Sequence, residues 1–242
     1  EKVSLKKSNY RSIKKLSLLS LSKNVGSQRA IALGLRFIGF EYKKKFGVVI
    51  MDSDGQDNPK GIVKFLEKSR LYPNQSIVAN RGQRKEPFWF RLCYETYRNL
   101  IKVFTLKNIK FGNFSYIVDQ DIKKIFKKSD LWSAYPPTVI KNLKIKTITI
   151  DRDKRFTGDS KMNFVKLIIH AARVFSVLKT RILLSSSIFS LIGYFAFFEK
   201  NLIVFNLLII LLILFNFLNF LLPICNSKEF SKNFKKLKIK NF

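Results

Sequence analysis

FGVVIMDSDGQD, residues 46–57, decides the fold of this chain. Its β-branched first half lacks any alternation of polar and apolar residues, which predicts a strand buried on both faces of a parallel sheet. Ligands of such sheets bind beyond the carboxyl ends of the strands. Asp52 and Asp54 leave the predicted strand one residue apart, where both carboxylates can approach one hard cation. The alternative is an ordinary solvated turn, because Asp, Ser, Gly and Asn all favour turns.

Helical and strand patterns alternate on both sides of this stretch, which predicts an α/β sheet. Before it, residues 27–38 have the pattern of a helix, in which Gly34 would allow close packing on the sheet. After it, we expect helices over 60–69, 88–104 and 117–128, and strands over 76–81 and 143–150.

The chain is strongly basic, with 46 Lys and Arg against 16 Asp and Glu, a net charge of +30. Such a charge is typical of nucleic-acid binding. Here the basic residues are spread along the chain, and no zinc-finger spacing or aromatic RNA-binding motif organises them. We therefore expect no nucleic-acid partner, and favour attraction to anionic membrane lipid.

Two uncharged apolar runs, 182–198 and 202–224, approach or reach the length of about 20 residues that a membrane-spanning helix requires. Only three residues separate them, which predicts a hairpin whose outer ends emerge on the same side. Those ends are basic, so the rule that positive residues stay inside puts them and the rest of the chain in the cytoplasm. The expected location is the cell (inner) membrane, with two passes. A very hydrophobic buried helix pair is the alternative.

Residues 161–180, just before the hairpin, have apolar positions at helical spacing. They predict an amphipathic helix lying in the membrane interface. A helix packed on the soluble domain is the alternative, and the two are compatible. His170, the only histidine, falls in this helix and is expected to have no catalytic role.

Four segments together resemble the membrane-anchored branch of glycosyltransferase family 2, which includes dolichol-phosphate mannosyltransferase and bacterial polyprenyl-phosphate glycosyltransferases. They are SKNVGSQRAIALGL from Ser22, VVIMDSDGQDNP from Val48, GNFSYI from Gly112 and RFTGDSKMN from Arg155. With the membrane hairpin, the resemblance covers nearly the whole chain from Leu18 onward.

The resemblance implies a GT-A (Rossmann-like) domain, a nucleotide-sugar donor and a Mg²⁺ or Mn²⁺ ion. It also implies inverting transfer of the sugar to a polyprenyl phosphate, such as undecaprenyl or dolichyl phosphate. The site residues carried over are polar or charged, apart from Gly158, which gives a basic loop its turn. They are Asp52, Asp54 and Gln56 for the metal; Asp52, Gln56, Arg81 and Ser160 for the donor; and Asp54, Arg155 and Lys161 for catalysis.

The chain departs from the family pattern in two places. Asn113 and Ser115 stand in GNFS where many members have GDFR or GSFR, so no charge role is carried over to them. The family's first strands, with a base-binding motif and a further aspartate, have no counterpart after Glu1, and we expect them upstream. On this basis we divide the chain into a GT-A domain lacking its first strands (1–160), an interfacial helix (161–180), a transmembrane hairpin (181–224) and a basic cytoplasmic tail (225–242).

Two other functions stay open. One is transfer to a different lipid-linked or glycan acceptor in cell-envelope polysaccharide synthesis. The other is an inactive membrane scaffold, which a native start near Glu1 would favour. The sequence also leaves the oligomeric state open, a homo-oligomer included.

Overall fold

The computed structural model describes residues 17–42, 46–81, 88–106, 108–151, 153, 156, 164–234 and 238–241. Its main sheet has four strands in the order β2-β4-β3-β5. These are β2 (Gly47–Ile50), β3 (Ser76–Arg81), β4 (Phe111–Val118) and β5 (Ile145–Ile150). β4 is antiparallel to both of its neighbours, while β3 and β5 are parallel. Strands β2, β3 and β5 therefore run the same way, and their carboxyl ends share one edge with the beginning of β4.

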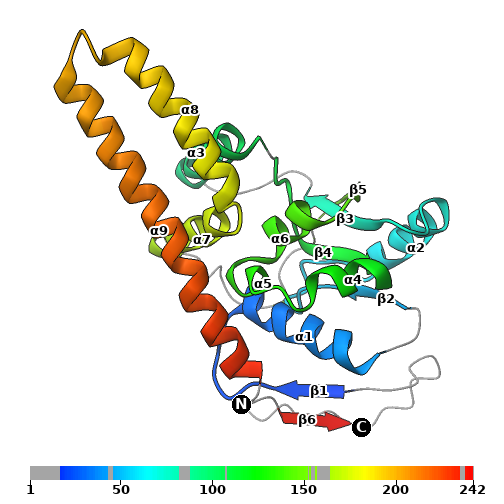
Figure 1. Cartoon of the computed structure of the whole chain (residues 1–242). Coiled ribbons are helices and arrows are strands. Elements are labelled where there is room, and N and C mark those ends of the chain that lie inside the picture. The colour runs from blue at the N-terminus through cyan, green and yellow to red at the C-terminus, as the bar shows by residue number, and fades with distance from the viewer. Residues whose placement is uncertain are drawn as a thin grey trace.

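Helices cover both faces of this sheet (Figure 1). The larger core lies under α1 (Ser27–Glu41), α4 (Asp119–Ile125), α5 (Asp130–Ser133) and α6 (Tyr135–Asn142), and includes Val78. The smaller core lies under α2 (Gly61–Leu71) and includes Ile77. Because side chains alternate along a strand, these two consecutive residues of β3 serve opposite cores. The sheet is thus the middle layer of an α/β structure.

Three C-terminal helices form the region predicted to meet the membrane: α7 (Phe164–Val177), α8 (Lys179–Phe197) and α9 (Leu202–Phe234). Figure 1 shows α8 and α9 as an antiparallel pair that projects away from the sheet. In the described part of the chain, they are the two helices long and apolar enough to cross a membrane. Only 17% of the apolar window of α8 and 6% of that of α9 is buried. These two helices therefore do not form a buried core pair.

Helix α7 has two kinds of surface. Toward its C-terminal end Val174 and Phe175 are buried in a cluster shared with α3 (Phe88–Thr105) and α8. Toward its N-terminal end Val165 and Ile168 are exposed. Packing on the sheet domain, the alternative from the sequence, therefore applies to the C-terminal part of the helix, and the interfacial position of its N-terminal part stays a prediction.

Helix α9 continues beyond residue 224, where the sequence predicted a tail, and ends on the soluble domain. Glu229 accepts a hydrogen bond from Trp132 Nε1 at 3.1 Å and forms an ion pair with Arg29 at 3.1 Å. The Arg36 guanidinium lies over the rings of Phe230 and Phe234 at 4.7 and 4.6 Å from their centroids. These contacts fix the end of α9 against α1. Beyond it, β6 (Lys238–Asn241) pairs antiparallel with β1 (Ser17–Ser20).

The structure corrects several sequence-based expectations. The sheet is mixed rather than parallel, because residues 111–118 form the antiparallel strand β4; the helix predicted over 117–128 consequently begins at Asp119. β2 is an edge strand of the described sheet, and its first residue is exposed rather than buried. Gly34 faces a cavity of about 400 Å³ between α1, β1 and β2, and a Cβ there would meet no atom within 4 Å. The close-packed glycine of α1 is Gly39, whose Cβ would meet the Phe126 ring at 2.5 Å.

Candidate active site at the carboxyl edge of the sheet

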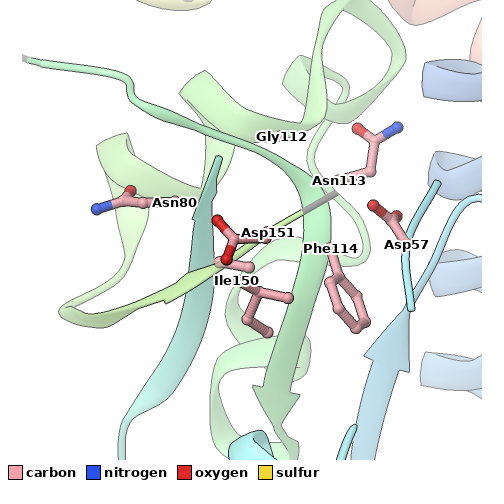
Figure 2. Close-up of a pocket in the computed structure, with 8 residues that line it drawn as sticks. Asp57, Asn80, Gly112, Asn113, Phe114, Ile150 and Asp151 are labelled. Carbon is pink, nitrogen blue, oxygen red and sulfur yellow. The ribbon is translucent and has the colours of Figure 1, made fainter. Parts of the chain in front are cut away.

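The described part of the predicted site lies at the edge where β2, β3 and β5 end and β4 begins. A cavity of about 10 Å³ at this edge is lined by polar residues from all four strand ends: Asp57, Asn80, Asn113 and Asp151. Figure 2 shows these side chains. A cavity of this size has room for one water molecule. This is the edge at which α/β sheets bind their ligands.

The turn after β2 is held by its own acidic side chains. Asp57, which is 4% exposed, accepts a hydrogen bond from the backbone N–H of Asp52 at 2.9 Å. Asp54 accepts one from the backbone N–H of Gln56 at 3.1 Å. Gly55 between them has a φ of 84°, a conformation that glycine adopts at little cost. Asp52, Asp54 and Gln56 themselves are half-buried, which leaves them accessible to a ligand.

The chain that follows β5 folds onto this turn. Two backbone hydrogen bonds of 3.0 Å join them: Phe156 N–H donates to the carbonyl of Asp54, and Asp153 N–H donates to the carbonyl of Gln56. The Phe156 ring lies so close to Gly55 that a Cβ there would come within 2.5 Å of it. The turn that carries the predicted metal ligands is therefore in contact with residue 156, the second position of the segment RFTGDSKMN.

A line of buried amides supports Asp52 from behind. Asn113 Nδ2 donates to Asp52 Oδ1 at 2.9 Å, and Gln28 Nε2 donates to Asn113 Oδ1 at 2.7 Å. Gln28 Oε1 in turn accepts a hydrogen bond from the Tyr135 backbone N–H at 2.8 Å. Four elements, the turn after β2, β4, α1 and α6, thus fix the orientation of one carboxylate.

Tyr135 closes the inner end of this line. Its hydroxyl lies 2.6 Å from the Ser115 hydroxyl, and its side chain is fully buried. Burial raises the pKa of Tyr135 far above its ordinary value, although the hydrogen bond with Ser115 acts in the opposite direction. The phenol is therefore neutral at every physiological pH, and Ser115 and Tyr135 belong to the core rather than to the reacting surface.

The structure brings together only part of the predicted site. Asp52, Asp54 and Gln56 lie in one turn, as the sequence predicted. Arg81 is the last residue of β3 and pairs with Ile150, which places its backbone at the same edge, while its side chain lies outside the described part. Arg155, Gly158, Ser160 and Lys161 also fall outside the described residues.

The metal prediction rests on a small set of ligands. Within the described ranges, no three His, Cys, Asp or Glu side chains form a group that could hold a metal ion by themselves. Mg²⁺ is commonly held by one or two carboxylates, with water and substrate phosphates in the other positions. Asp52 and Asp54 would supply the two carboxylates that this kind of site uses, which is fewer than an all-protein cage requires.

Sequence reasoning missed the supporting residues. Gln28 and Asn113 both lie in segments that the resemblance singles out, yet 85 positions separate them and no local pattern indicates their contact. Asp57 is part of the opening stretch, where its burial could not be distinguished from that of a solvated turn residue. Asp153 has a partner in Asn58, whose Nδ2 donates to its carboxylate at 2.6 Å.

Comparison of the sequence with models of protein families and with curated proteins finds no match.

Proposed function

We propose that this protein is an inverting glycosyltransferase that moves a sugar from a nucleotide-sugar donor to a polyprenyl phosphate at the cytoplasmic face of a membrane. The observation that supports this best is the pair of backbone hydrogen bonds from Phe156 and Asp153 to the acidic turn. These bonds join two segments at one edge of the sheet. One is the turn predicted to hold the metal, and the other leads into the predicted basic loop. The GT-A assignment of the domain is part of the proposal.

The reaction needs little acid–base chemistry from the protein. The second pKa of a phosphate monoester is about 6, so the acceptor is largely ionised at neutral pH. Its oxygen attacks the anomeric carbon and forms a new C–O bond, while the bond from that carbon to the nucleotide diphosphate breaks on the opposite face. The configuration inverts and the nucleoside diphosphate leaves. No histidine base is required, and the proposal gives no catalytic role to His170, which lies in α7.

The main task of the site is to stabilise the negative charge of the departing diphosphate. A divalent ion, when bound, would supply positive charge to these oxygens. In this proposal Asp52, Asp54 and Gln56 hold that ion and the donor, while Asn113 and Gln28 keep Asp52 oriented through the hydrogen bonds of 2.9 and 2.7 Å. Arg155, Ser160 and Lys161 bind the phosphates from the other side, and Arg81 contacts the donor.

The membrane part of the proposal explains how a lipid acceptor reaches this site. Helices α8 and α9 anchor the domain, and α7 rests between it and the bilayer surface. Phe164, the first residue of α7, is only eight positions beyond Phe156, which contacts the acidic turn. At no more than about 3.5 Å per residue, the turn lies within about 28 Å of that helix. In this proposal the acceptor phosphate therefore has to bridge at most about this distance between α7 and the acidic turn.

Glycolipid synthesis by the full-length protein, with any coding sequence that precedes Glu1, tests the proposal. Protein in nanodiscs would receive labelled nucleotide sugars and Mg²⁺ with one of three acceptors: polyprenyl phosphate, a diphosphate-linked lipid glycan, or a soluble glycan. We expect a chelator-sensitive product with polyprenyl phosphate. Product formed with one of the other acceptors alone would identify the alternative transfer reaction. Absence of product from the common donors with every acceptor would contradict the proposal and favour the inactive scaffold.

A further inference from the structure

Helix α3 carries an apolar stripe on the side that faces away from the protein. Leu92, Leu100 and Val103 are eight and three residues apart, a spacing that keeps them on one side of the helix, and Leu106 directly follows the last helical residue with a φ of 53°. All four are exposed, Val103 by 52% and Leu106 by 82%. On the opposite side Ile101 is buried in the cluster that α3 shares with α7 and α8. Apolar side chains therefore reach the surface on this side of the helix, beside the exposed polar residues Thr96 and Asn99.

The last turn of α3 is attached to the membrane hairpin rather than to the sheet. Arg181 donates to the carbonyl of Thr105 at 3.0 Å, and Ser185 donates to the carbonyl of Phe104 at 2.7 Å. The final carbonyls of a helix have no partner within it, and at a soluble surface water satisfies them. Here side chains of α8 do so, as a helix end in a water-poor region requires.

The ring of Phe104 shows how far along the hairpin this contact reaches. It lies 5.2 Å from the Phe189 ring and 5.4 Å from the Phe215 ring, measured between centroids. Phe189 and Phe215 belong to the two apolar runs, 182–198 and 202–224. Phe189 is seven residues into the first run, so at 1.5 Å per residue it lies about 10 Å from the start of that run. A hairpin that spans the bilayer would carry the end of α3 to the level of the upper acyl chains.

The charged neighbours of the stripe suit such a position. Lys102 and Lys110 are exposed on either side of Leu106, and Lys179 and Arg181 begin α8 at the same level. Lysine and arginine at this depth extend to the headgroups while their methylene groups remain in apolar surroundings. An anionic leaflet adds an attraction for each of these charges.

From these contacts we propose that the C-terminal half of α3 is a membrane-interface helix, which inserts Leu100, Val103 and Leu106 among the lipids beside α8. Its partner is the bilayer itself, because the stripe continues the lipid-facing surface of the hairpin. This inference rests on the membrane part of the proposed function and is independent of its chemistry. It also gives β3, which ends at the candidate site, a direct connection to the membrane through the next helix in the chain.

Nitroxide labels at single cysteines test this inference in the full chain. Cys93 and Cys225 would be replaced by Ser, and Val103→Cys and Leu106→Cys labelled separately in nanodiscs of phosphatidylethanolamine and phosphatidylglycerol. Power saturation in oxygen and in a water-soluble nickel chelate reports the depth of each label. We expect both labels to favour oxygen, with a chelate accessibility several-fold below that of a label in water.

Two reference positions make the result decisive. Leu71→Cys, at the end of α2 and 71% exposed, reports an aqueous surface, and Leu191→Cys, 59% exposed in α8, reports the bilayer interior. Labels at 103 and 106 that match residue 71, while residue 191 is in lipid, would overturn the inference. Chelate access at residue 191 itself would overturn it together with the membrane anchor. Failure of glycosyl transfer alone would leave the depth of α3 unchanged, so the two proposals are tested separately.

Discussion

Asn113 in β4 donates a hydrogen bond of 2.9 Å to the Asp52 carboxylate in the turn after β2. Asn113 is 6% exposed and accepts a second hydrogen bond from Gln28, so it cannot turn away without leaving buried polar groups unpaired. An aspartate at position 113 could not donate this hydrogen bond as a carboxylate and would place a second negative charge beside Asp52. Asn113 thus has a structural role at the candidate site.

Replacement of Asn113 by Ala removes both hydrogen bonds at once. We expect the free energy of unfolding to fall by about 1–3 kcal/mol, the cost of leaving buried polar groups unpaired. Because Asp52 loses its orientation, transfer activity should fall by roughly 10- to 100-fold, as for other residues that support a metal ligand. Activity assays beside thermal unfolding measure the two effects. The exposed Asn74→Ala is the matched control. Unchanged activity in Asn113→Ala would show that Asn113 does not contribute to the site.

Two glycines should respond to Ala in opposite directions. At Gly55, with φ of 84°, the new methyl group would meet the Phe156 ring, so the turn and the segment after β5 must separate. We expect a loss of at least about 1 kcal/mol, the usual cost of a left-handed residue with a Cβ. At Gly34, inside α1, nothing obstructs the methyl group, and stability should rise by about 0.5–1 kcal/mol. Unfolding midpoints measure both changes. Equal effects at the two positions would contradict the contact between Phe156 and the turn.

Glu229 should make the docking of α9 depend on pH. Burial raises the pKa of this carboxyl, but the hydrogen bond from Trp132 and the charges of Arg29 and Lys23 outweigh burial and lower it below the ordinary 4.5. A carboxyl with a lowered pKa stabilises the folded state above its unfolded pKa, and this stability is lost as pH falls through the folded value. The wild type should therefore unfold at a higher temperature than Glu229→Gln near pH 7.

The difference between these two proteins should begin to shrink as the pH falls below the ordinary pKa of 4.5. It should disappear once the pH has passed the lower pKa of the folded wild-type carboxyl, because that carboxyl is then protonated as well. Thermal unfolding of both proteins across this range measures the change. Glu67→Gln, on the exposed surface of α2, is the control and should track the wild type at every pH. A difference that persists unchanged at low pH would show that Glu229 acts through packing rather than through its charge.

Local patterns predicted the parts of the fold in which sequence and packing agree. The strand at 76–81 and the helix at 88–104 have strong periodicity, and the structure has them as Ser76–Arg81 and Phe88–Thr105. β4 was missed as a strand because its polar Asn113 and Ser115 lie on the buried side, where they form hydrogen bonds. A periodicity argument assigns such residues to solvent. The antiparallel direction of β4 likewise depends on pairings across the sheet that no local segment encodes.

The candidate site likewise contains residues that the sequence identified and residues that it missed. Asp52, Asp54 and Gln56 were identifiable because they follow an apolar run directly, and the structure has them in one turn. Gln28 and Asn113 reach that turn only through the fold, from elements 85 residues apart. The docked end of α9 was also missed, because its lysines suggested a solvated tail while Glu229 and Phe230 make the contacts.

The most direct test of the account is the charge of Asp54. Asp54→Asn keeps an oxygen that can accept the backbone N–H of Gln56, so the turn should persist while the negative charge is lost. Wild type, Asp54→Asn and the control Glu67→Gln would be compared in nanodiscs for Mg²⁺-dependent transfer of labelled sugar to polyprenyl phosphate. The account predicts that wild type and Glu67→Gln form the glycolipid and that Asp54→Asn loses at least about 100-fold of the rate, an effect near 2.7 kcal/mol. Full activity in Asp54→Asn would contradict it.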